Sequence, residues 1–243
     1  MSFITENVQI ARERIRAAAL SAGRDPGEIR LLAATKMNTP EAVREAVAAG
    51  VDLCGENRVQ EFLEKQRENA YAPCPVHFIG HLQKNKVKYL VGAVELIHSV
   101  DSPELLEAIH RRAAALGVTQ DVLLEVNIGA EASKSGVSPE ELPALLAAAA
   151  DYPAVRVRGL MTIPPVEKVP GENQGYFRRM RQLFVDIRGK KYDNISMTEL
   201  SMGMSGDYED AVRCGATIVR LGTALFGPRN YNRQEAPPHG TFG

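Results

Sequence analysis

The chain has 243 residues, 44% of them hydrophobic and 24% charged, which is ordinary for a globular protein and excludes a disordered one. Lysine and arginine total 29 against 30 aspartate and glutamate residues, so the net charge is −1. A protein that binds nucleic acid without specificity normally carries a basic excess, and we therefore expect no nucleic-acid partner.

The N-terminal segment predicts a helix rather than a targeting signal. Val8, Ile15 and Leu20 stand among charged residues in Thr5–Ala22, and the segment ends at Gly23, a pattern typical of an amphipathic helix. The segment lacks the apolar core of a secretory signal, and no later apolar stretch approaches the ~20 residues that span a bilayer. Three cysteines are too few for a disulfide framework or a structural zinc site. We expect a cytoplasmic protein with no metal and no membrane partner.

After this helix, short apolar runs alternate with helical stretches along the chain. The predicted strands are Ile29–Thr35, Leu53–Glu56, Val76–Gly80, Leu96–Ser99, Val122–Asn127, Val155–Met161, Ile195–Ser201 and Ile218–Phe226. The predicted helices between them are Pro40–Ala49, Arg58–Asn69, Asn85–Val91, Pro103–Leu116, Pro139–Asp151, Tyr176–Arg188 and Tyr208–Cys214. Several of these helices start with a capping hydroxyl before proline, as in Thr39-Pro40, Ser102-Pro103 and Ser138-Pro139.

Strands that alternate with helices favour parallel pairing with right-handed crossovers. We therefore expect an α/β fold, a single-domain (β/α)8 TIM-type barrel over residues 1–243 with an extra N-terminal helix. Residues from about 229 to 243 are expected to form a flexible tail. An open doubly wound sheet is the alternative, although the glycine-rich first turn usual in such folds is absent.

Lys36 is the first candidate for chemistry, because barrel enzymes and binding proteins place their sites at the carboxyl ends of the strands. It follows the apolar run that ends at Thr35. Partial burial at a barrel mouth would lower the pKa of its amine, and a neutral amine can form a Schiff base with an aldehyde. A lysine at this position can equally extend into solvent.

The loops after the seventh and eighth strands predict a phosphate site. Ser201-Met-Gly-Met-Ser205 and Arg220-Leu-Gly-Thr223 combine glycines with hydroxyl groups at the two loops that usually hold phosphate in such barrels. Simple turn residues would explain the glycines as well. Arg220 alternates with Val219 and Leu221, so it is expected to point into the barrel. There it needs a partner, such as a ring nitrogen, a phosphate or the Glu199 carboxylate.

A Schiff-base lysine opposite a phosphate site fits pyridoxal phosphate (PLP). In addition, a series of motifs in the same order over about residues 6–231 resembles the motifs of a known family. They are Ala34-Thr35-Lys36, Gly55-Glu56-Asn57-Arg58, His77–Lys86, Val126-Asn127, Ser133–Gly136, Arg158–Met161, Leu200–Ser205, Val219–Thr223 and Phe226-Gly227. The chain resembles the PLP homeostasis family, which implies a barrel like the N-terminal domain of alanine racemases with PLP held as an aldimine by Lys36. One departure is Asn38, where many relatives carry a second lysine.

The resemblance also implies the other cofactor-binding residues. Ser201, Met202, Gly222 and Thr223 match the phosphate-binding loops, and Arg220 matches the arginine near the pyridine nitrogen or the phosphate. Asn57 and Met161 match positions that line the ring. Lys134 is a second amine that could accept the cofactor transiently, or else a solvated loop lysine.

The resemblance implies a non-enzymatic role in vitamin B6 homeostasis, in which the protein buffers PLP or delivers it to apoenzymes. No catalytic residue is assigned, because an arginine beside the pyridine nitrogen makes the ring a poor electron sink and no second domain supplies a base. A racemase-type enzyme using Tyr208 or His81 is the alternative. A Schiff-base aldolase is a third interpretation, but it would need its lysine on a different strand. We expect a monomer.

Overall fold

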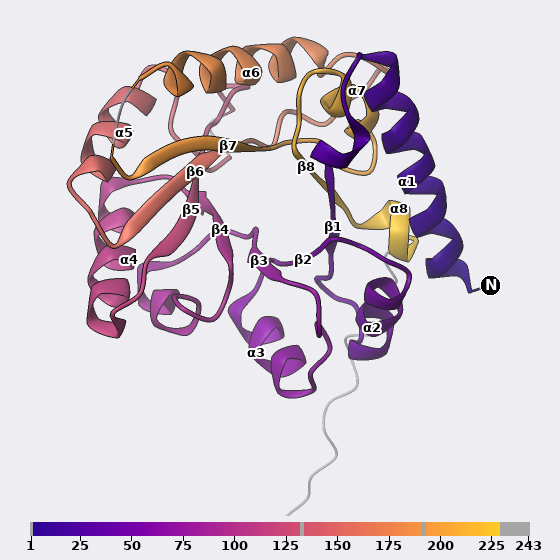
Figure 1. Ribbon diagram of the computed structural model, residues 1–243, viewed down its shortest axis with the longest axis horizontal. Helices are drawn as coiled ribbons and strands as arrows, with labels where there is room; N and C mark the ends of the chain where they lie inside the picture. The colour runs from indigo at the N-terminus through magenta and orange to yellow at the C-terminus, as the bar shows by residue number, and fades with distance from the viewer. Residues whose placement is uncertain (1, 132–133, 191–192, 229–243) are drawn as a thin grey trace, which may run out of the picture.

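In the computed structural model, residues 2–131, 134–190 and 193–228 are described; Ser133 and the predicted tail lie outside these ranges. Eight parallel strands close into a barrel in the order β1 to β8 (Figure 1). Their bounds are β1 Arg30–Ala34, β2 Leu53–Glu56, β3 Val76–Phe78, β4 Leu96–Val100, β5 Gln120–Glu125, β6 Val155–Met161, β7 Ile195–Ser201 and β8 Ile218–Leu221. The (β/α)8 barrel prediction is confirmed.

Helices surround the strands on the outside of the barrel (Figure 1). They are α1 Phe3–Ser21, α2 Pro40–Ala48, α3 Val59–Arg67, α4 Pro103–Leu116, α5 Leu142–Ala150, α6 Gln174–Arg188, α7 Tyr208–Arg213 and α8 Thr223–Phe226. Two short 3₁₀ helices cover Pro26–Glu28 and Lys84–Tyr89. The described helices include none with the length and apolar character needed to cross a bilayer.

The N-terminal helix α1 precedes the eight strand–helix units and covers the outside of the barrel beside α7 and α8. Its buried face includes Val8, Ala11 and Ile15 and packs against α7 and α8. The Asn7 side chain donates a hydrogen bond to the Leu225 carbonyl (3.0 Å), which ties α1 to the end of the chain after β8. Figure 1 shows the indigo helix beside the yellow one. The expected extra N-terminal helix is therefore present and holds the two ends of the barrel sequence together.

Helix starts follow the predicted caps only in part. Thr39 accepts a hydrogen bond from the Ala42 amide, as expected of a capping residue. Ser138 and Glu141 exchange side-chain to backbone hydrogen bonds, yet helix α5 begins only at Leu142, three residues after the predicted start. The predicted eighth strand also ends early, at Leu221, because the chain turns at Gly222 into the short helix α8. This turn opens the mouth of the barrel beside β8.

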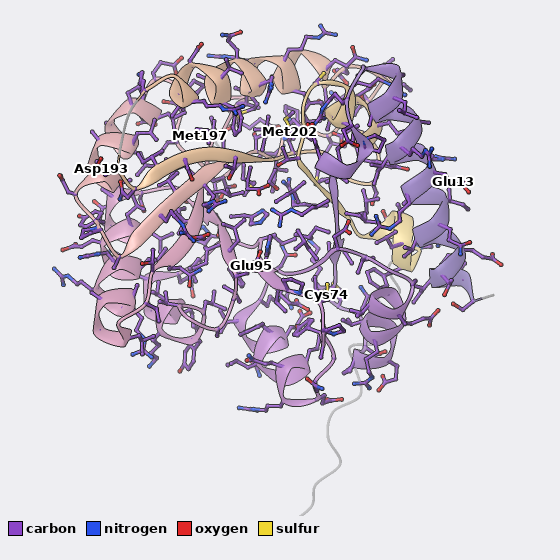
Figure 2. The ribbon with its side chains drawn as sticks, in the orientation of Figure 1. Glu13, Cys74, Glu95, Asp193, Met197 and Met202 are labelled. Atoms are coloured by element: carbon purple, nitrogen blue, oxygen red, sulfur yellow. The ribbon has the colours of Figure 1, made fainter. Side chains whose placement is uncertain are left out.

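Side chains fill the space inside the barrel, so it is a packed core and not a pore (Figure 2). The inner cluster takes one apolar side chain from each of seven strands or strand ends: Leu32, Leu53, Ile79, Leu96, Leu123, Met161 and Ile218. A larger cluster between the strands and helices holds the residues that alternate with them, such as Leu31 and Ala33 on β1. This alternation decides which residues above the inner cluster face the mouth of the barrel.

Candidate cofactor site at the barrel mouth

Lys36 lies at the mouth, in the position that the alternation on β1 predicts. Leu32 and Ala34 face inward, and Lys36 follows two residues later with a half-buried side chain. Strand β2 pairs Ala34 with Gly55, which puts Lys36 and Asn57 at the same height above neighbouring strands. Strand β8 pairs Leu32 with Arg220, so Gly222 stands near Ala34, and a Cβ built on Gly222 would lie 3.7 Å from that of Ala34. The predicted lysine, ring and phosphate positions therefore meet at one edge of the barrel.

A buried ion pair between α3 and β2 fixes the backbone around Lys36. Lys65 donates to the Thr35 carbonyl (2.7 Å) and pairs with the Glu56 carboxylate (2.7 Å). The same Glu56 oxygen accepts the Thr35 hydroxyl (2.6 Å) and the Tyr71 hydroxyl (3.1 Å). These side chains are almost fully buried, and burial is the main reason that the pKa of Tyr71 is raised. Lys36 therefore begins from an anchored strand end.

The next residue is anchored from the same helix. Met37 has φ of 62°, in the left-handed region that residues with a side chain seldom adopt. Its amide donates to the Glu61 carboxylate (2.6 Å), and Lys65 lies 3.5 Å from that carboxylate. Helix α3 thus holds the chain on both sides of Lys36. Sequence reasoning missed this bracing, because the pairing of Lys65 with Thr35 spans 30 positions and no local pattern predicts it.

Asn57 and Met161 line the mouth from opposite sides. Asn57 is half-buried at the end of β2, and its side-chain oxygen is buried without a hydrogen-bond partner in the described structure. The loop after β3 approaches the Asn57 backbone closely at Gly80. Only glycine allows this approach, because a Cβ at Gly80 would lie 2.1 Å from the Asn57 carbonyl oxygen. Met161 belongs to the inner apolar cluster and is 1% exposed. One side of the mouth is therefore polar and the other apolar.

Arg220 points into the barrel, as the alternation on β8 predicts, and is 5% exposed. Its guanidinium donates to the Ser201 hydroxyl (2.6 Å) and to the Thr162 carbonyl (2.8 Å). Burial lowers the pKa of Arg220 to about 10, so the group stays charged at neutral pH. Glu199, considered as its partner, instead pairs with Arg30 (2.7 Å). Arg220 is therefore a fixed cation beneath the mouth.

Glu125 is a mouth residue that was not among the predicted site residues. It ends β5, is 6% exposed, and its pKa is raised to about 7 by burial and by the charge of Asp101, while Arg220 acts in the opposite direction. The sequence feature that could have indicated this residue is its position near the end of the predicted strand Val122–Asn127. Of the acidic groups, Glu125 has the largest electrostatic effect on the pKa of Arg220, and its carboxyl group can gain or lose a proton near neutral pH.

The two predicted phosphate loops are joined by Ser205. Its hydroxyl accepts the amide N–H groups of Gly222 (3.2 Å) and Ala224 (3.1 Å), so these two donors converge on one point. Asp207, itself buried, accepts the Met204 amide (2.7 Å) and holds this loop in shape. Converging backbone amides on a braced loop are typical of anion sites.

The remaining phosphate-loop residues lie in different surroundings. Thr223 is exposed at the start of α8, where its hydroxyl can reach a ligand. Met202 is labelled in Figure 2, and its side chain is buried in the outer core, not in the mouth. Its amide donates to the Ile218 carbonyl. Met202 therefore shapes the loop through its backbone and its packing. Lys134 donates to the Pro164 carbonyl (2.7 Å) and pairs with Glu131, which ties it to the loops after β5 and β6.

Comparison with known proteins agrees with this geometry. The pyridoxal phosphate homeostasis protein of Aquifex aeolicus is 47% identical over 226 residues, covering 93% of this chain and 98% of that one. The family described as alanine racemase, N-terminal domain, matches residues 4–230. The chain belongs to this family.

Two solved structures of the family member PipY of Synechococcus elongatus PCC7942 resemble this one along almost their whole length. The structure without PLP has a TM-score of 0.78 at 39% identity, and the one with PLP bound has 0.76 at 38%. Each comparison covers 89% of this chain and 99% of that one. The family predicted from the motifs is confirmed.

Proposed function

We propose that this chain binds pyridoxal 5'-phosphate at the barrel mouth through Lys36, and that it acts in vitamin B6 homeostasis in the cytoplasm without catalysing a reaction. The main observation that supports this proposal is that the half-buried Lys36, held by helix α3, and the buried Arg220 face the same mouth. The PLP-bound structure of PipY, which is 38% identical, supports the choice of ligand.

The residues at the mouth fit this group. PLP supplies an electrophilic aldehyde, which the Lys36 amine binds covalently with loss of water. The unpartnered oxygen of Asn57 and the side chain of Met161 are available to line the ring. The loops of Ser201, Met202, Gly222 and Thr223 meet at the Ser205 hydroxyl, which accepts the Gly222 and Ala224 amides, and a phosphate would take the place of this hydroxyl as their acceptor. Arg220 supplies the positive charge beneath them.

The surroundings of the two candidate bases favour a carrier over an enzyme. Tyr208 packs in the outer core at 5% exposure, and burial raises the pKa of its hydroxyl. His81 has a side chain 60% exposed, with Nδ1 3.8 Å from Asp101. A base that moves protons efficiently needs a fixed position with water excluded, and neither residue combines these properties with access to the mouth. Loading and release to PLP-dependent apoenzymes is then the function of the site.

The experiment that tests the ligand is an absorbance titration with PLP, followed by borohydride reduction and peptide mass mapping. We expect a visible band and the reduced label on Lys36. The Lys36→Ala variant should lose both, whereas Lys84→Ala, at an exposed surface lysine, should keep them. No band in the wild-type protein, or a label on lysines other than Lys36, would contradict the proposed site.

A second experiment separates the carrier from a racemase-type enzyme. The PLP-loaded protein is incubated with L- and D-amino acids in D2O, and the loss of each α-proton signal is followed by NMR. We expect no exchange above that of free PLP with Lys36→Ala protein. Exchange that disappears in His81→Asn would instead establish the enzyme.

A further inference from the structure

Two buried histidines connect Arg220 with the opposite end of the barrel. His77 on β3 and His98 on β4 both have 0% exposure. His77 Nδ1 lies 2.9 Å from His98 Nε2, and the ring centroids are 5.0 Å apart. Neither residue has a part in the proposed function. Buried imidazoles in hydrogen-bonded contact need a definite arrangement of their protons, so their partners are informative.

The contacts continue from this pair in both directions. His98 Nδ1 lies 3.1 Å from the Ser201 hydroxyl, which accepts from Arg220 at 2.6 Å. His77 Nε2 lies 3.3 Å from the Glu95 carboxylate. Glu95 precedes β4, is labelled in Figure 2, and its side chain is 51% exposed. Five residues therefore form one row from solvent at the amino ends of the strands to the cation beneath the mouth.

The Glu95 end of the row fixes the direction of the hydrogen bonds that involve the two histidines. The Arg220 guanidinium can only donate. Glu95 as a carboxylate can only accept, and the hydrogen bond from His77 lowers its pKa, which keeps it ionised. Burial lowers the pKa of both His77 and His98, so both rings are neutral, each with one donor and one acceptor nitrogen.

The proton positions then follow in order. His77 donates from Nε2 to Glu95, and its Nδ1 accepts from Nε2–H of His98. Nδ1 of His98 must accept from the Ser201 hydroxyl, and the Ser201 oxygen accepts from Arg220. The same distances would also suit the reverse order. Both histidines would then be protonated on Nδ1, so that His77 donates to His98 and His98 donates to the Ser201 oxygen. The Ser201 hydrogen would be free to bond elsewhere. Only the acceptor at Glu95 distinguishes the two orders.

We infer that Glu95 is a positioning residue for the cofactor site: through His77 and His98 it commits the Ser201 hydroxyl hydrogen to His98, while the Ser201 oxygen accepts from Arg220. Ser201 then cannot donate this hydrogen to a phosphate, and the hydroxyls of Thr223 and Ser205 are the side-chain donors that remain in the two loops. The inference rests on the proposed function only where it assigns Arg220 and Ser201 to a PLP site.

The proton positions can be measured without cofactor, by long-range ¹H–¹⁵N NMR of protein labelled with ¹⁵N-histidine. We expect His77 and His98 in the wild-type protein to be neutral and protonated on Nε2. The Glu95→Ala variant should populate the Nδ1-protonated form of both. Protonation on Nδ1 in the wild-type protein would overturn the inference, whether or not the variant folds.

Glu199→Gln is the matched control. Like Glu95, Glu199 pairs with Arg30 at this end of the barrel, but it accepts its hydrogen bond from Thr217 and not from a histidine. It should leave both histidines protonated on Nε2, which separates loss of a hydrogen-bond acceptor from loss of charge. If Glu95→Ala also leaves them unchanged, or if Glu199→Gln changes them equally, Glu95 does not set the direction.

A PLP titration of the same variants tests the link to the cofactor. Because Glu95→Ala no longer commits the Ser201 hydrogen to His98, it should change the PLP dissociation constant several-fold relative to Glu199→Gln, with the label still on Lys36. An equal dissociation constant in the two variants would overturn the positioning role. Absence of PLP binding in the wild-type protein would refute the proposed function instead, and the NMR result would still stand by itself.

Discussion

Glu125 shows how one buried carboxyl group can make the mouth sensitive to pH. Burial and the charge of Asp101 raise its pKa from 4.5 to about 7. The protonated form is therefore favoured in the folded protein, and ionisation costs about 3 kcal/mol of folding free energy. This cost is absent below the unfolded pKa and fully present above the folded one, so stability should fall as the pH rises from about 4.5 through 7.

The Glu125→Gln variant should remove this dependence. Because glutamine stays neutral, the variant should gain about 3 kcal/mol relative to the wild-type protein at pH 8 and little at pH 4.5. Urea unfolding at the two pH values measures both differences. Equal differences at both pH values would mean that Glu125 titrates normally in the folded chain.

The residues of the mouth also show how far the sequence can be interpreted. Alternation along a strand predicted the inward direction of Lys36 and Arg220, because it depends only on neighbouring residues. The partner of Arg220 was not predictable in the same way: Glu199 has the right charge, but Arg30 takes it at the other end of the barrel. Which side chains meet across the barrel depends on register between strands far apart in sequence.

Helix α3 braces the end of β1, and the Lys65–Glu56 pair is the contact that does so. Lys65→Met should destabilise the protein by about 3–5 kcal/mol, because the Glu56 carboxylate stays buried without a compensating charge. It should also slow the trapping of PLP on Lys36 by borohydride, since the Thr35 carbonyl loses its donor. Urea unfolding and timed mass mapping measure the two effects.

Lys84→Met, at an exposed lysine of the 3₁₀ helix, is the control and should change neither quantity. The double variant Lys65→Met with Glu56→Leu should recover part of the lost stability, because it removes the uncompensated charge. If the double variant recovers stability but the trapping of PLP stays slow, then Lys65 positions Lys36 directly, in addition to stabilising the fold. Unchanged trapping in Lys65→Met would contradict the brace.

The contact between the loops after β2 and β3 requires glycine at position 80. In Gly80→Ala the new Cβ would lie 2.1 Å from the Asn57 carbonyl oxygen, and relieving this overlap should cost about 1–3 kcal/mol. Because Asn57 moves with the loop, PLP affinity should fall as well. Gly175→Ala, at an exposed position of α6, meets nothing within 4 Å and should be neutral or slightly stabilising. Equal effects of the two substitutions on unfolding would contradict the close approach.

Element boundaries were harder to predict than the elements themselves. The predicted strand from Ile218 to Phe226 was extended past Gly222 because Ala224–Phe226 is again apolar, yet the strand ends at Leu221 and a helix starts at Thr223. Ser205 stabilises the turn at Gly222, because its hydroxyl accepts hydrogen bonds from the amides of Gly222 and Ala224. Such a cap from another loop leaves no signal in the run itself.

The barrel interior consists of a polar layer at each end and an apolar layer between them. Arg30, Glu95 and Glu199 form ion pairs at the amino ends of the strands, and the mouth residues occupy the carboxyl ends. The inner apolar cluster separates the two layers. Among the described residues, hydrogen bonds through the side chains of His77 and His98 cross it. A ligand at the mouth thus contacts a region rigidly linked to the far end.

Binding at the mouth should therefore stabilise the whole barrel as one unit. A ligand at 100 times its dissociation constant adds about 2.7 kcal/mol, which for a chain of this size raises Tm by about 5–10 °C. Saturating PLP should produce this rise in scanning calorimetry, and Lys36→Ala should lose most of it. Because we expect a monomer, Tm at fixed ligand excess should not depend on protein concentration. A Tm that rises with protein concentration would instead show that copies of the chain associate, and light scattering would then give their number.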